Sequence, residues 1–358
     1  MMGPVLIAAG GTGGHVFPAL AVAQELRARS VPVVWLGTRT GLEARVVPAA
    51  GIEMEWLDVG GVRGKGLATR LRAPFALAHA CWQAWRVLRR HRPRTLLGMG
   101  GFVAGPGGLV APLARVPLVV HEQNAVAGLT NRILARIARR VLEAMPGTFP
   151  PSREAVHTGN PVRADIAALP EPAERFSGRT APARLLVLGG SQGARALNER
   201  LPKALSGLPD ALRPVVHHQC GARHIEAARA AYAAAGVEAE ITPFIEDMAS
   251  AYGTADLVIG RAGAMSVWEL AAAGVGALLV PYPHAVDDHQ TVNARWLADA
   301  GAAVVVQEHD LDVERLTREL KTLLGNRAGL ADRAVRARAL ARPDAAGTVA
   351  DIVEEVAR

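Results

Sequence analysis

The sequence predicts an α/β protein of two domains, each built on a parallel sheet with crossover helices. Its 358 residues suit two domains of about 150 residues each. Short runs rich in Val, Ile and Leu alternate with helical patterns, which is typical of parallel sheets. The two halves also begin alike, because residues 5–15 and 185–195 each read as an apolar strand, a glycine-rich turn and a helix start. We therefore expect two Rossmann-like domains that face each other across a cleft.

Seven short apolar runs have the length and composition of buried strands, with helical patterns between them. The expected strands are Val5 to Ala9, Val31 to Leu36, Thr95 to Leu97, Leu118 to His121, Leu185 to Leu188, Leu257 to Ile259 and Ala277 to Val280.

The segment Leu169 to Ala183 is rich in proline and polar residues, so we interpret it as the linker between the domains or its flank. The first domain is expected over residues 1–160 and the second over residues 161–340. Residues 341–358 are expected to form a helix that packs back on the first domain.

Composition excludes several classes of protein. Hydrophobic residues make up 50% of the chain and charged residues 20%, which is a globular composition. Aromatics are only 4%, which disfavours nucleic-acid binding through stacked bases. Cys81 and Cys220 are the two cysteines, so neither a disulfide framework nor a zinc site is expected. No stretch has the pattern of a signal peptide or a membrane span.

The charge is unevenly distributed. Residues 1–160 contain 19 basic and 8 acidic side chains, a net charge of +11, while the remainder has a net charge of −4. The first domain is therefore expected to face an anionic surface. Nucleic acid, anionic lipid and a phosphorylated substrate each fit this charge.

Glycine-rich turns indicate phosphate binding. The loop from Gly10 to His15 precedes a helix, where backbone N–H groups and the helix dipole attract anions. Neither this loop nor the one at residues 189–193 has the spacing of a dinucleotide motif. A P-loop at Gly64 and Lys65 fails as well, because Val59 stands where the first glycine should be and Gly66 where Ser or Thr should be. Two further clusters, residues 60–66 with Arg63 and Lys65 and residues 98–108, suit a second diphosphate.

Six stretches together resemble the family 28 glycosyltransferases of peptidoglycan synthesis. They occur in family order and cover nearly the whole chain: GGTGGHVFPALAVA at 10–23, GMGGFVAGPGG at 98–108, HEQNAVAGLTN at 121–131, GNPVR at 159–163, GGSQGARALN at 189–198, and the region 260–294. The resemblance implies the GT-B fold, in which two Rossmann-like domains face each other.

The same resemblance implies an inverting hexosyltransferase. It would move N-acetylglucosamine (GlcNAc) from UDP-GlcNAc to the muramyl 4-hydroxyl of lipid I, an undecaprenyl-diphosphate-linked muramyl pentapeptide, giving lipid II and UDP. The first domain would bind the acceptor and the second the donor, with the enzyme peripheral on the cytoplasmic face of the bacterial plasma membrane. No cofactor and no nucleic-acid partner are expected.

Two alternatives remain open at this point. One is another GT-B enzyme that transfers a UDP-sugar to a lipid such as diacylglycerol. The other is a membrane-bound nucleotide-sugar binder that catalyses nothing.

Site residues are carried over from the family's motifs. The residues implied for UDP-GlcNAc are Thr12, Gly13, Gly14, Asn124, Arg163, Ser191, Gln192, Gly193, Ile245, Ala264, Met265, Ser266, Glu269 and Gln290. Those implied for the acceptor diphosphate are Gly13, Gly14, Gly100, Gly101, Arg63 and Lys65. Position 289 is a histidine where some relatives have glutamine, so its contribution stays open. No metal is expected, because Asp310 and Asp312 read as a helix start.

The expected general base is His15, which ends the first glycine loop at a helix N-terminus. Glu122 is the runner-up, with His121 beside it, because the motif that contains both borders the expected cleft.

Residues 67–92 predict a helix that faces a membrane. At 100° per residue, Leu77, Cys81, Ala84 and Leu88 share one side and should face the core. The opposite side collects aromatic and basic residues that suit an anionic lipid surface. These are Phe75, Trp82, Trp85, Arg86 and Arg89, with Arg132, Arg136, Arg139 and Arg140 extending the basic surface.

Overall fold

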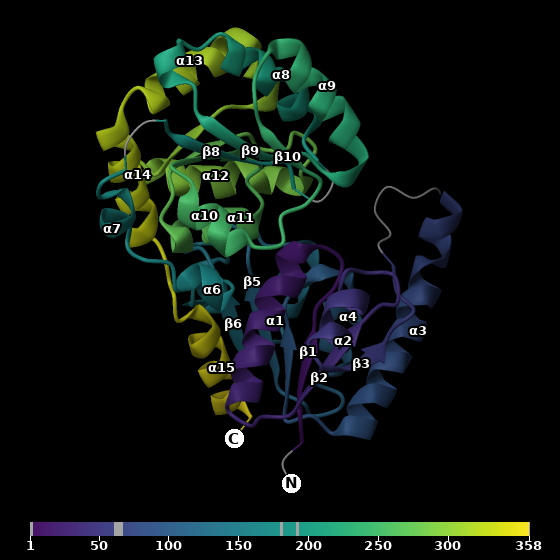
Figure 1. Ribbon diagram of the computed structural model, residues 1–358. Coiled ribbons are helices and arrows are strands. Elements are labelled where there is room, and N and C mark those ends of the chain that lie inside the picture. The colour runs from purple at the N-terminus through teal and green to yellow at the C-terminus, as the bar shows by residue number, and fades with distance from the viewer. Residues whose placement is uncertain (1–2, 61–66, 180–181, 191–192, 358) are drawn as a thin grey trace. The chain divides into compact units, whose positions relative to one another are not determined.

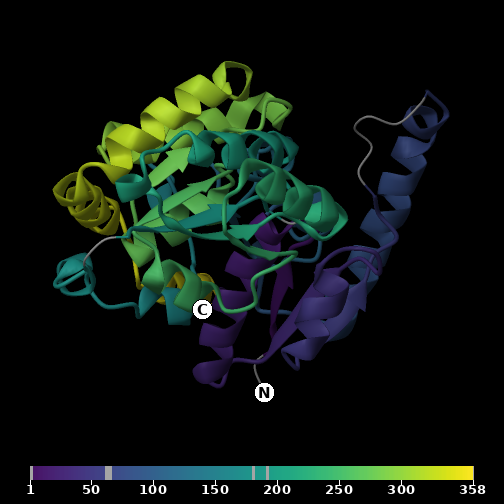
Figure 2. The ribbon, with the colours of Figure 1, turned by 45° about the horizontal axis from the view of Figure 1, so that its top comes forward.

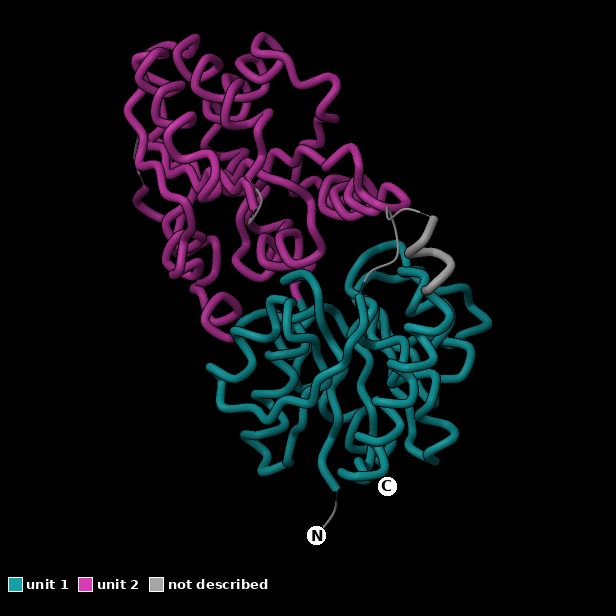
Figure 3. Tube along the Cα trace, turned by 90° about the vertical axis from the view of Figure 1, so that its right-hand side faces the viewer, with its two compact units in different colours: residues 1–163, 342–358 teal, residues 164–341 magenta. Residues whose placement is uncertain are grey.

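The computed structural model describes residues 3–60, 67–179, 182–190 and 193–357. The chain divides into two compact units, coloured separately in Figure 3. Unit 1 comprises residues 1–163 and 342–358, and unit 2 comprises residues 164–341.

Unit 1 is built on a seven-stranded parallel sheet with the order β3-β2-β1-β4-β5-β6-β7. Its strands are β1 (Val5–Ala8), β2 (Val33–Gly37), β3 (Glu53–Trp56), β4 (Thr95–Gly98), β5 (Leu118–Glu122), β6 (Arg140–Glu143) and β7 (Val156–His157).

The central strands of unit 1 are buried on both faces, because helices cover the two sides of the sheet. Val5 and Ile7 of β1 pack into one core, while Leu6 and Ala8 pack into the other. The four residues of β1 are therefore all apolar. A strand with one exposed face would instead alternate apolar and polar residues.

Two layers of helices enclose this sheet (Figure 1). One contains α1 (Gly13–Ala28), α2 (Glu43–Ala49) and the last helix, α15 (Ala345–Val356), which packs against α1. The other contains α3 (Leu67–His91), α4 (Gly101–Val110) and α5 (Leu129–Leu134).

Unit 2 has a six-stranded parallel sheet with the order β10-β9-β8-β11-β12-β13. Its strands are β8 (Arg184–Leu188), β9 (Val215–Gln219), β10 (Glu240–Thr242), β11 (Leu257–Gly260), β12 (Ala277–Leu279) and β13 (Ala303–Val305).

Helices lie on both faces of this sheet, as Figure 2 shows. One face carries α8 (Arg195–Ser206), α9 (Ile225–Ala235) and α13 (Val313–Leu324), and the other α10 (Met248–Thr254), α11 (Ala264–Ala273) and α12 (His289–Asp299). The remaining helices are α6 (Ala164–Ala167), α7 (Pro172–Phe176) and α14 (Arg327–Ala339).

The predicted α/β fold class is confirmed, and all seven expected strands occur within two residues of their expected ends. Asp312 begins a helix as expected, since its Oδ1 accepts a hydrogen bond of 2.6 Å from the backbone N–H of Arg315.

The segment 169–183 lies in unit 2 shortly after the crossing, so it flanks the linker and is not the linker itself. The chain crosses at Arg163 and returns at Arg342. Arg175 of α7 donates hydrogen bonds to the carbonyls of Ala273 and Gly274 at the C-terminal end of α11. This anchoring makes a proline-rich segment part of unit 2.

Candidate functional site

Each sheet reverses its strand order beside its first strand. In unit 1 the strand β1 pairs with β2 and β4, and in unit 2 the strand β8 pairs with β9 and β11. Ligands of open parallel sheets bind beyond the carboxyl ends of the strands at such a switch point. Each unit therefore has a candidate site of its own, at the loops after β1 and β4 in unit 1 and at the loops after β8 and β11 in unit 2. Most predicted residues lie in or near these loops.

A buried carboxylate supports the glycine loop of unit 1. Glu43 accepts hydrogen bonds from the backbone N–H of Gly11 at 3.0 Å and from the N–H and hydroxyl of Thr38 at 3.0 and 2.8 Å. A Cβ atom at Gly10 would lie 2.6 Å from Oε1 of Glu43. Sequence reasoning missed Glu43, because a single glutamate after a short turn carries no motif.

The loops after β1 and β4 interlock at the switch point of unit 1. Gly100 and Gly101 have φ angles of +92° and +75°, which favour glycine. A Cβ atom at Gly100 would lie 2.9 Å from Nδ1 of His15, and one at Gly101 would lie 2.4 Å from the carbonyl oxygen of Gly10. Gly100 therefore makes room for His15, and Gly101 makes room for the Gly10 carbonyl, in addition to their predicted role at a diphosphate.

His15 lies in the first turn of α1 and is half-buried. Its Nδ1 atom is 2.8 Å from Oε1 of Gln123, which is buried after β5. His121, at the end of β5, is also buried, and burial lowers its pKa to about 4. A neutral His121 at physiological pH is suited to positioning neighbours rather than to exchanging protons with substrate.

Both carboxylate oxygens of Glu122 already accept hydrogen bonds. Oε1 accepts from the backbone N–H groups of Gln123 and Asn124, at 3.1 Å each, and from Nδ2 of Asn124 at 3.0 Å. Oε2 accepts from the N–H of Gly128 at 3.0 Å and from Nδ2 of Asn131 at 2.9 Å. This geometry suits a residue that holds the loop after β5, and it favours His15 as the base.

The glycine loop of unit 2 follows β8 and is supported by Gln219. Oε1 of Gln219 accepts from the N–H of Gly190, and its Nε2 donates to the carbonyl oxygen of Gly190, both at 3.1 Å. Gly193 has a φ angle of +76°, and a Cβ atom there would lie 2.5 Å from the carbonyl oxygen of Cys220. Two residues predicted in this loop, Ser191 and Gln192, lie outside the described residues.

The loop after β11 leads into α11, whose first turn contains Ala264, Met265 and Ser266. The N-terminal N–H groups of this ten-residue helix are donors for an anion. Glu269 lies one turn further along α11 and is partly exposed. Its Oε2 accepts a hydrogen bond of 3.1 Å from the hydroxyl of the buried Tyr252.

Ile245 lies in the loop between β10 and α10 with its side chain buried. A buried side chain leaves the backbone as the part of Ile245 that can recognise a base edge. This placement suits the role that the resemblance implies.

Gln290, in the first turn of α12, joins two loops of unit 2. Its Oε1 accepts from the backbone N–H groups of Ala262 at 3.3 Å and Tyr282 at 3.0 Å. Just before it, Asp287 and Asp288 have φ angles of +53° and +49°, a strained conformation for residues with side chains. Nδ1 of His289 is 2.7 Å from the carbonyl oxygen of Val286, so that side chain holds its own turn.

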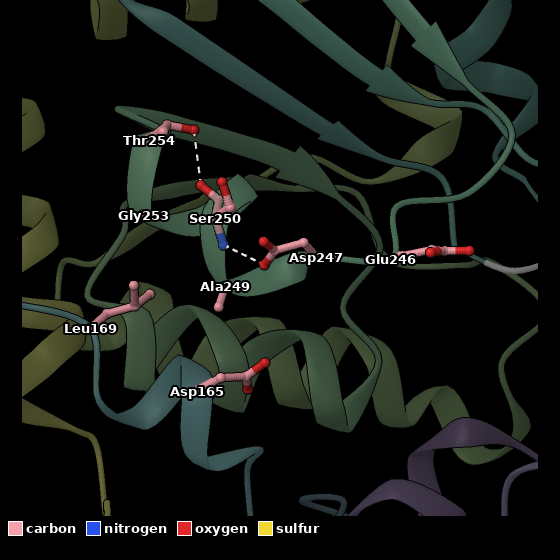
Figure 4. Close-up of a pocket in the computed structure, with 8 residues that line it drawn as sticks. All are labelled: Asp165, Leu169, Glu246, Asp247, Ala249, Ser250, Gly253 and Thr254. Atoms are coloured by element: carbon pink, nitrogen blue, oxygen red, sulfur yellow. Dashed lines mark hydrogen bonds between the residues drawn. The ribbon is translucent and has the colours of Figure 1, made fainter. Parts of the chain in front are cut away.

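A hollow of about 670 Å³ lies beside α10 and α6 (Figure 4). It is lined by Asp165, Leu169, Glu246, Asp247, Ala249, Ser250, Gly253 and Thr254. Three carboxylates would repel a diphosphate, so this hollow does not suit the donor's phosphates. None of the predicted site residues lines it.

Other predicted residues lie outside these loops. Arg163 is the last residue of unit 1 before the chain crosses, while Arg63 and Lys65 lie outside the described residues. Among the described residues, Glu53, Glu55 and His91 form the group with ligand atoms close enough together to hold a metal ion. Glu55 already bonds Arg90 and His91 at 2.9 and 2.7 Å, and the group is not at either switch point.

The predicted membrane helix exposes its aromatic residues. Phe75, Trp82 and Trp85 are 79%, 51% and 40% exposed. The guanidinium groups of Arg86 and Arg89 lie 4.8 Å from the ring of Trp82 and 5.6 Å from that of Trp85, in the range of cation–π contacts. Within the described part of the chain, no helix combines the length and apolarity needed to cross a bilayer.

One residue of this helix does not lie where the helical period predicts. Leu77 is 43% exposed, whereas Ala84 and Leu88 are buried as expected. Residues 74–79 are all exposed, whereas Ala80 is buried. Over residues 74–79 the helix therefore has no core for the helical period to face.

Comparison with known proteins extends these observations. Residues 5–143 match the glycosyltransferase family 28 N-terminal domain, and residues 184–349 match the family's C-terminal domain. A protein of Alkalilimnicola ehrlichii is 60% identical over 99% of both chains. A protein of Nitrosococcus oceani is 58% identical over 99% of this chain and 98% of its own. Both bear the name UDP-N-acetylglucosamine–N-acetylmuramyl-(pentapeptide) pyrophosphoryl-undecaprenol N-acetylglucosamine transferase.

Solved structures have the same fold as this chain. The crystal structure of Acinetobacter baumannii MurG matches with a TM-score of 0.86 and 44% identity over 99% of both chains. The glycosyltransferase of kitacinnamycin matches with a TM-score of 0.74 at 18% identity over the whole of both chains, which is a likeness of fold alone.

Proposed function

The chain belongs to glycosyltransferase family 28, and on this premise we propose that it is a hexosyltransferase of peptidoglycan synthesis. It transfers GlcNAc from UDP-GlcNAc to an N-acetylmuramyl-(pentapeptide) pyrophosphoryl-undecaprenol, the acceptor in its relatives' name. Full-length similarity to transferases of that name supports the activity. Within the structure, the observation that carries the proposal is His15, placed between the glycine loops after β1 and β4.

In this proposal unit 2 binds the donor. The N-termini of α8 and α11 follow glycine-containing loops and present backbone N–H groups that suit the two phosphates. The carboxylate of Glu269 can accept hydrogen bonds from both ribose hydroxyls. The backbone at Ile245 recognises the uracil edge, and Gln290 and Asn124 bind the sugar.

Unit 1 binds the acceptor. Its diphosphate lies against the loops of Gly13, Gly14, Gly100 and Gly101, and Arg63 and Lys65 add positive charge. The helices α3, α4 and α5 form one layer, and the exposed aromatic and basic side chains of α3 support attachment to an anionic membrane surface. The enzyme then works as a peripheral protein on the cytoplasmic face of the bacterial plasma membrane.

The reaction needs one proton transfer and one displacement. His15 accepts the proton of the muramyl 4-hydroxyl while the hydroxyl oxygen attacks the anomeric carbon. The new bond joins this oxygen to the anomeric carbon, and the bond from that carbon to the β-phosphate oxygen breaks. The electron pair leaves with UDP, and attack from the opposite face inverts the configuration. N–H groups at the glycine loop stabilise the negative charge on the leaving diphosphate.

The test measures UDP release by the full chain, with UDP-GlcNAc or UDP-glucose as donor and a lipid I analogue or diacylglycerol as acceptor. We expect release only with UDP-GlcNAc and the lipid I analogue, together with a product heavier by one GlcNAc. His15→Ala should lower kcat about 100-fold or more. Release with diacylglycerol would support the alternative lipid glycosyltransferase, and UDP-GlcNAc binding without release would support the non-catalytic binder.

A further inference from the structure

A series of hydrogen-bonded polar groups, most of them buried, connects His15 with Thr158 and Gly159, close to the point where the polypeptide passes into unit 2. Oε1 of Gln123 lies 2.8 Å from Nδ1 of His15, and Nε2 of Gln123 lies 3.1 Å from Nδ1 of His121. Nε2 of His121 lies 3.1 Å from both the hydroxyl oxygen of Thr158 and the carbonyl oxygen of Gly159. Gln123, His121 and Thr158 are all buried.

The contacts of His121 with Thr158 and Gly159 determine which of its ring nitrogens is protonated. The carbonyl oxygen of Gly159 can only accept, so Nε2 of His121 must carry a proton and donate it. The hydroxyl of Thr158 donates to the same carbonyl at 2.9 Å, which leaves its oxygen free to accept from His121 as well. A neutral imidazole has one N–H, so Nδ1 of His121 carries a lone pair and accepts.

A second backbone carbonyl fixes the orientation of the Gln123 amide. Nε2 of Gln123 donates to the carbonyl oxygen of His121 at 3.1 Å, in addition to Nδ1 of the same residue. A flipped amide would place an oxygen against both acceptors. The amide oxygen therefore faces His15, and Nδ1 of His15 must donate to it, because the other tautomer would bring two lone pairs to within 2.8 Å.

We propose that Gln123 and His121 are positioning residues that hold His15 as its Nδ1–H tautomer, so that its Nε2 atom is the one that takes the acceptor's proton. The role of that proton rests on the proposed function, whereas the tautomer rests only on the contacts within unit 1. The adjacent residues Glu122 and Asn124 have a different task, since Glu122 binds the loop backbone around Asn124.

The surroundings leave little room for another arrangement. Gly159 has a φ angle of +76°, and a Cβ atom there would lie 2.5 Å from Cβ of Arg342. The Gly159 carbonyl that accepts from His121 is therefore fixed in place by close packing of the backbone. On the other side, a Cβ atom at Gly100 would lie 2.9 Å from Nδ1 of His15, so the His15 ring packs directly against the Gly100 backbone. Burial keeps His121 neutral at physiological pH, so the proton order derived above holds where the enzyme works.

The test is 15N NMR of the full chain labelled at the histidine imidazoles, with His15→Ala used to assign the His15 signals. Without substrate, at pH 7.5, we expect the proton of His15 on Nδ1. Gln123→Leu should lose this preference and lower kcat at least about 10-fold, with the donor KM within about twofold. Gln123→Glu keeps an oxygen facing His15, so it should keep the Nδ1–H tautomer of His15. Its second oxygen replaces the donor to the carbonyl oxygen and Nδ1 of His121, so this variant should also be less stable than the original.

Thr95→Val is the matched control, because Thr95 is equally buried in unit 1 but its hydroxyl donates to the carbonyl of Val353, at the opposite end of the sheet from His15. It should change neither the tautomer nor kcat. A proton on Nε2 of His15 in the unaltered protein overturns the proposal, even if every variant fails to fold. Unchanged kcat and tautomer in Gln123→Leu overturn it as well. An Nδ1–H tautomer in a protein that transfers no GlcNAc would contradict the proposed function and leave the positioning intact.

Discussion

Gln219 and Gly190 exchange two hydrogen bonds, each of 3.1 Å, across the start of the glycine loop in unit 2. The Gln219 side chain, at the end of β9, thus bonds the N–H and the carbonyl of Gly190, which lies just beyond the end of β8. Glu43 does the corresponding work in unit 1, where it binds the N–H of Gly11 at 3.0 Å. The backbone at Gly11 and at Gly190 is therefore held by side chains of the protein itself.

Gln219→Leu should weaken donor binding. The change removes the two hydrogen bonds to Gly190, worth about 1 kcal/mol each, and a longer one of 3.4 Å to the carbonyl of Pro243. Because the backbone at Gly190 is then free, we expect the donor KM to rise about 10-fold with a smaller change in kcat. Steady-state UDP release at varied UDP-GlcNAc checks this. Ser206→Ala, at the far end of α8, should leave the KM unchanged. Equal KM values for the two variants would contradict the assigned role of the loop.

Glu43→Gln should lower stability and activity together. An amide group in place of one carboxylate oxygen sets a donor against the N–H of Gly11 or against Thr38, a loss of about 1–3 kcal/mol. Thermal unfolding and kcat measure the two effects. A variant as stable and active as the original would show that Glu43 does not hold the loop.

Glu269→Ala should raise the donor KM at least about 10-fold, because the carboxylate is proposed to bind the ribose hydroxyls. Tyr252→Phe removes the 3.1 Å hydrogen bond from the Tyr252 hydroxyl to Glu269 and keeps the carboxylate. Its donor KM should therefore lie between that of the original protein and that of Glu269→Ala. Titration with UDP alone separates nucleoside binding from transfer. If Glu269→Ala binds UDP normally, the nucleoside assignment is wrong.

Acid should destabilise the protein through its buried histidines. Burial lowers the pKa of His121 from 6.5 to about 4, so below pH 6.5 the unfolded chain binds a proton that the folded chain does not. Stability therefore falls as the pH drops from 6.5 to 4 and is unaffected by this group above that range, a loss of up to about 3 kcal/mol. Urea unfolding at pH 7 and pH 5 measures the slope.

A second histidine contributes in the same pH range, since burial also lowers the pKa of His218 to about 4. His121→Asn and His218→Asn should each flatten the pH dependence of stability, whatever they do to stability at pH 7. An unaltered slope in both variants would mean that other groups cause the acid sensitivity.

Membrane binding should depend on α3. Trp82→Ala with Trp85→Ala should weaken binding to vesicles of phosphatidylglycerol and phosphatidylcholine, and Arg86→Glu with Arg89→Glu should weaken it at least about 10-fold, since each cation contributes about 1 kcal/mol. Sedimentation with the vesicles measures both. Val335→Ser with Arg336→Glu, on exposed positions of unit 2, should bind as the original does. Equal loss in this control would contradict a membrane face on α3.

The strands that the sequence predicted share one property, which is burial on both faces. Runs such as Val5 to Ala8 and Leu257 to Gly260 are buried throughout, and their continuous apolar pattern is visible without a structure. The strand Glu53–Trp56 lies at the edge of its sheet with a polar pattern. The strand Val215–Gln219 ends in two histidines and a glutamine. Neither of these two strands has the continuous apolar pattern that predicts a buried strand.

The sequence by itself determined the fold class and the glycine loops, because strand pattern, backbone freedom and helix starts depend on neighbours along the chain. Tertiary structure decided what holds those loops and orients the base. Glu43 lies 32 residues from Gly11, and Gln123 lies 108 residues from His15. Such pairs have no signature in spacing, since they form only when the strand order brings the ends of β1, β2 and β5 to one edge of a sheet and removes water from between the side chains.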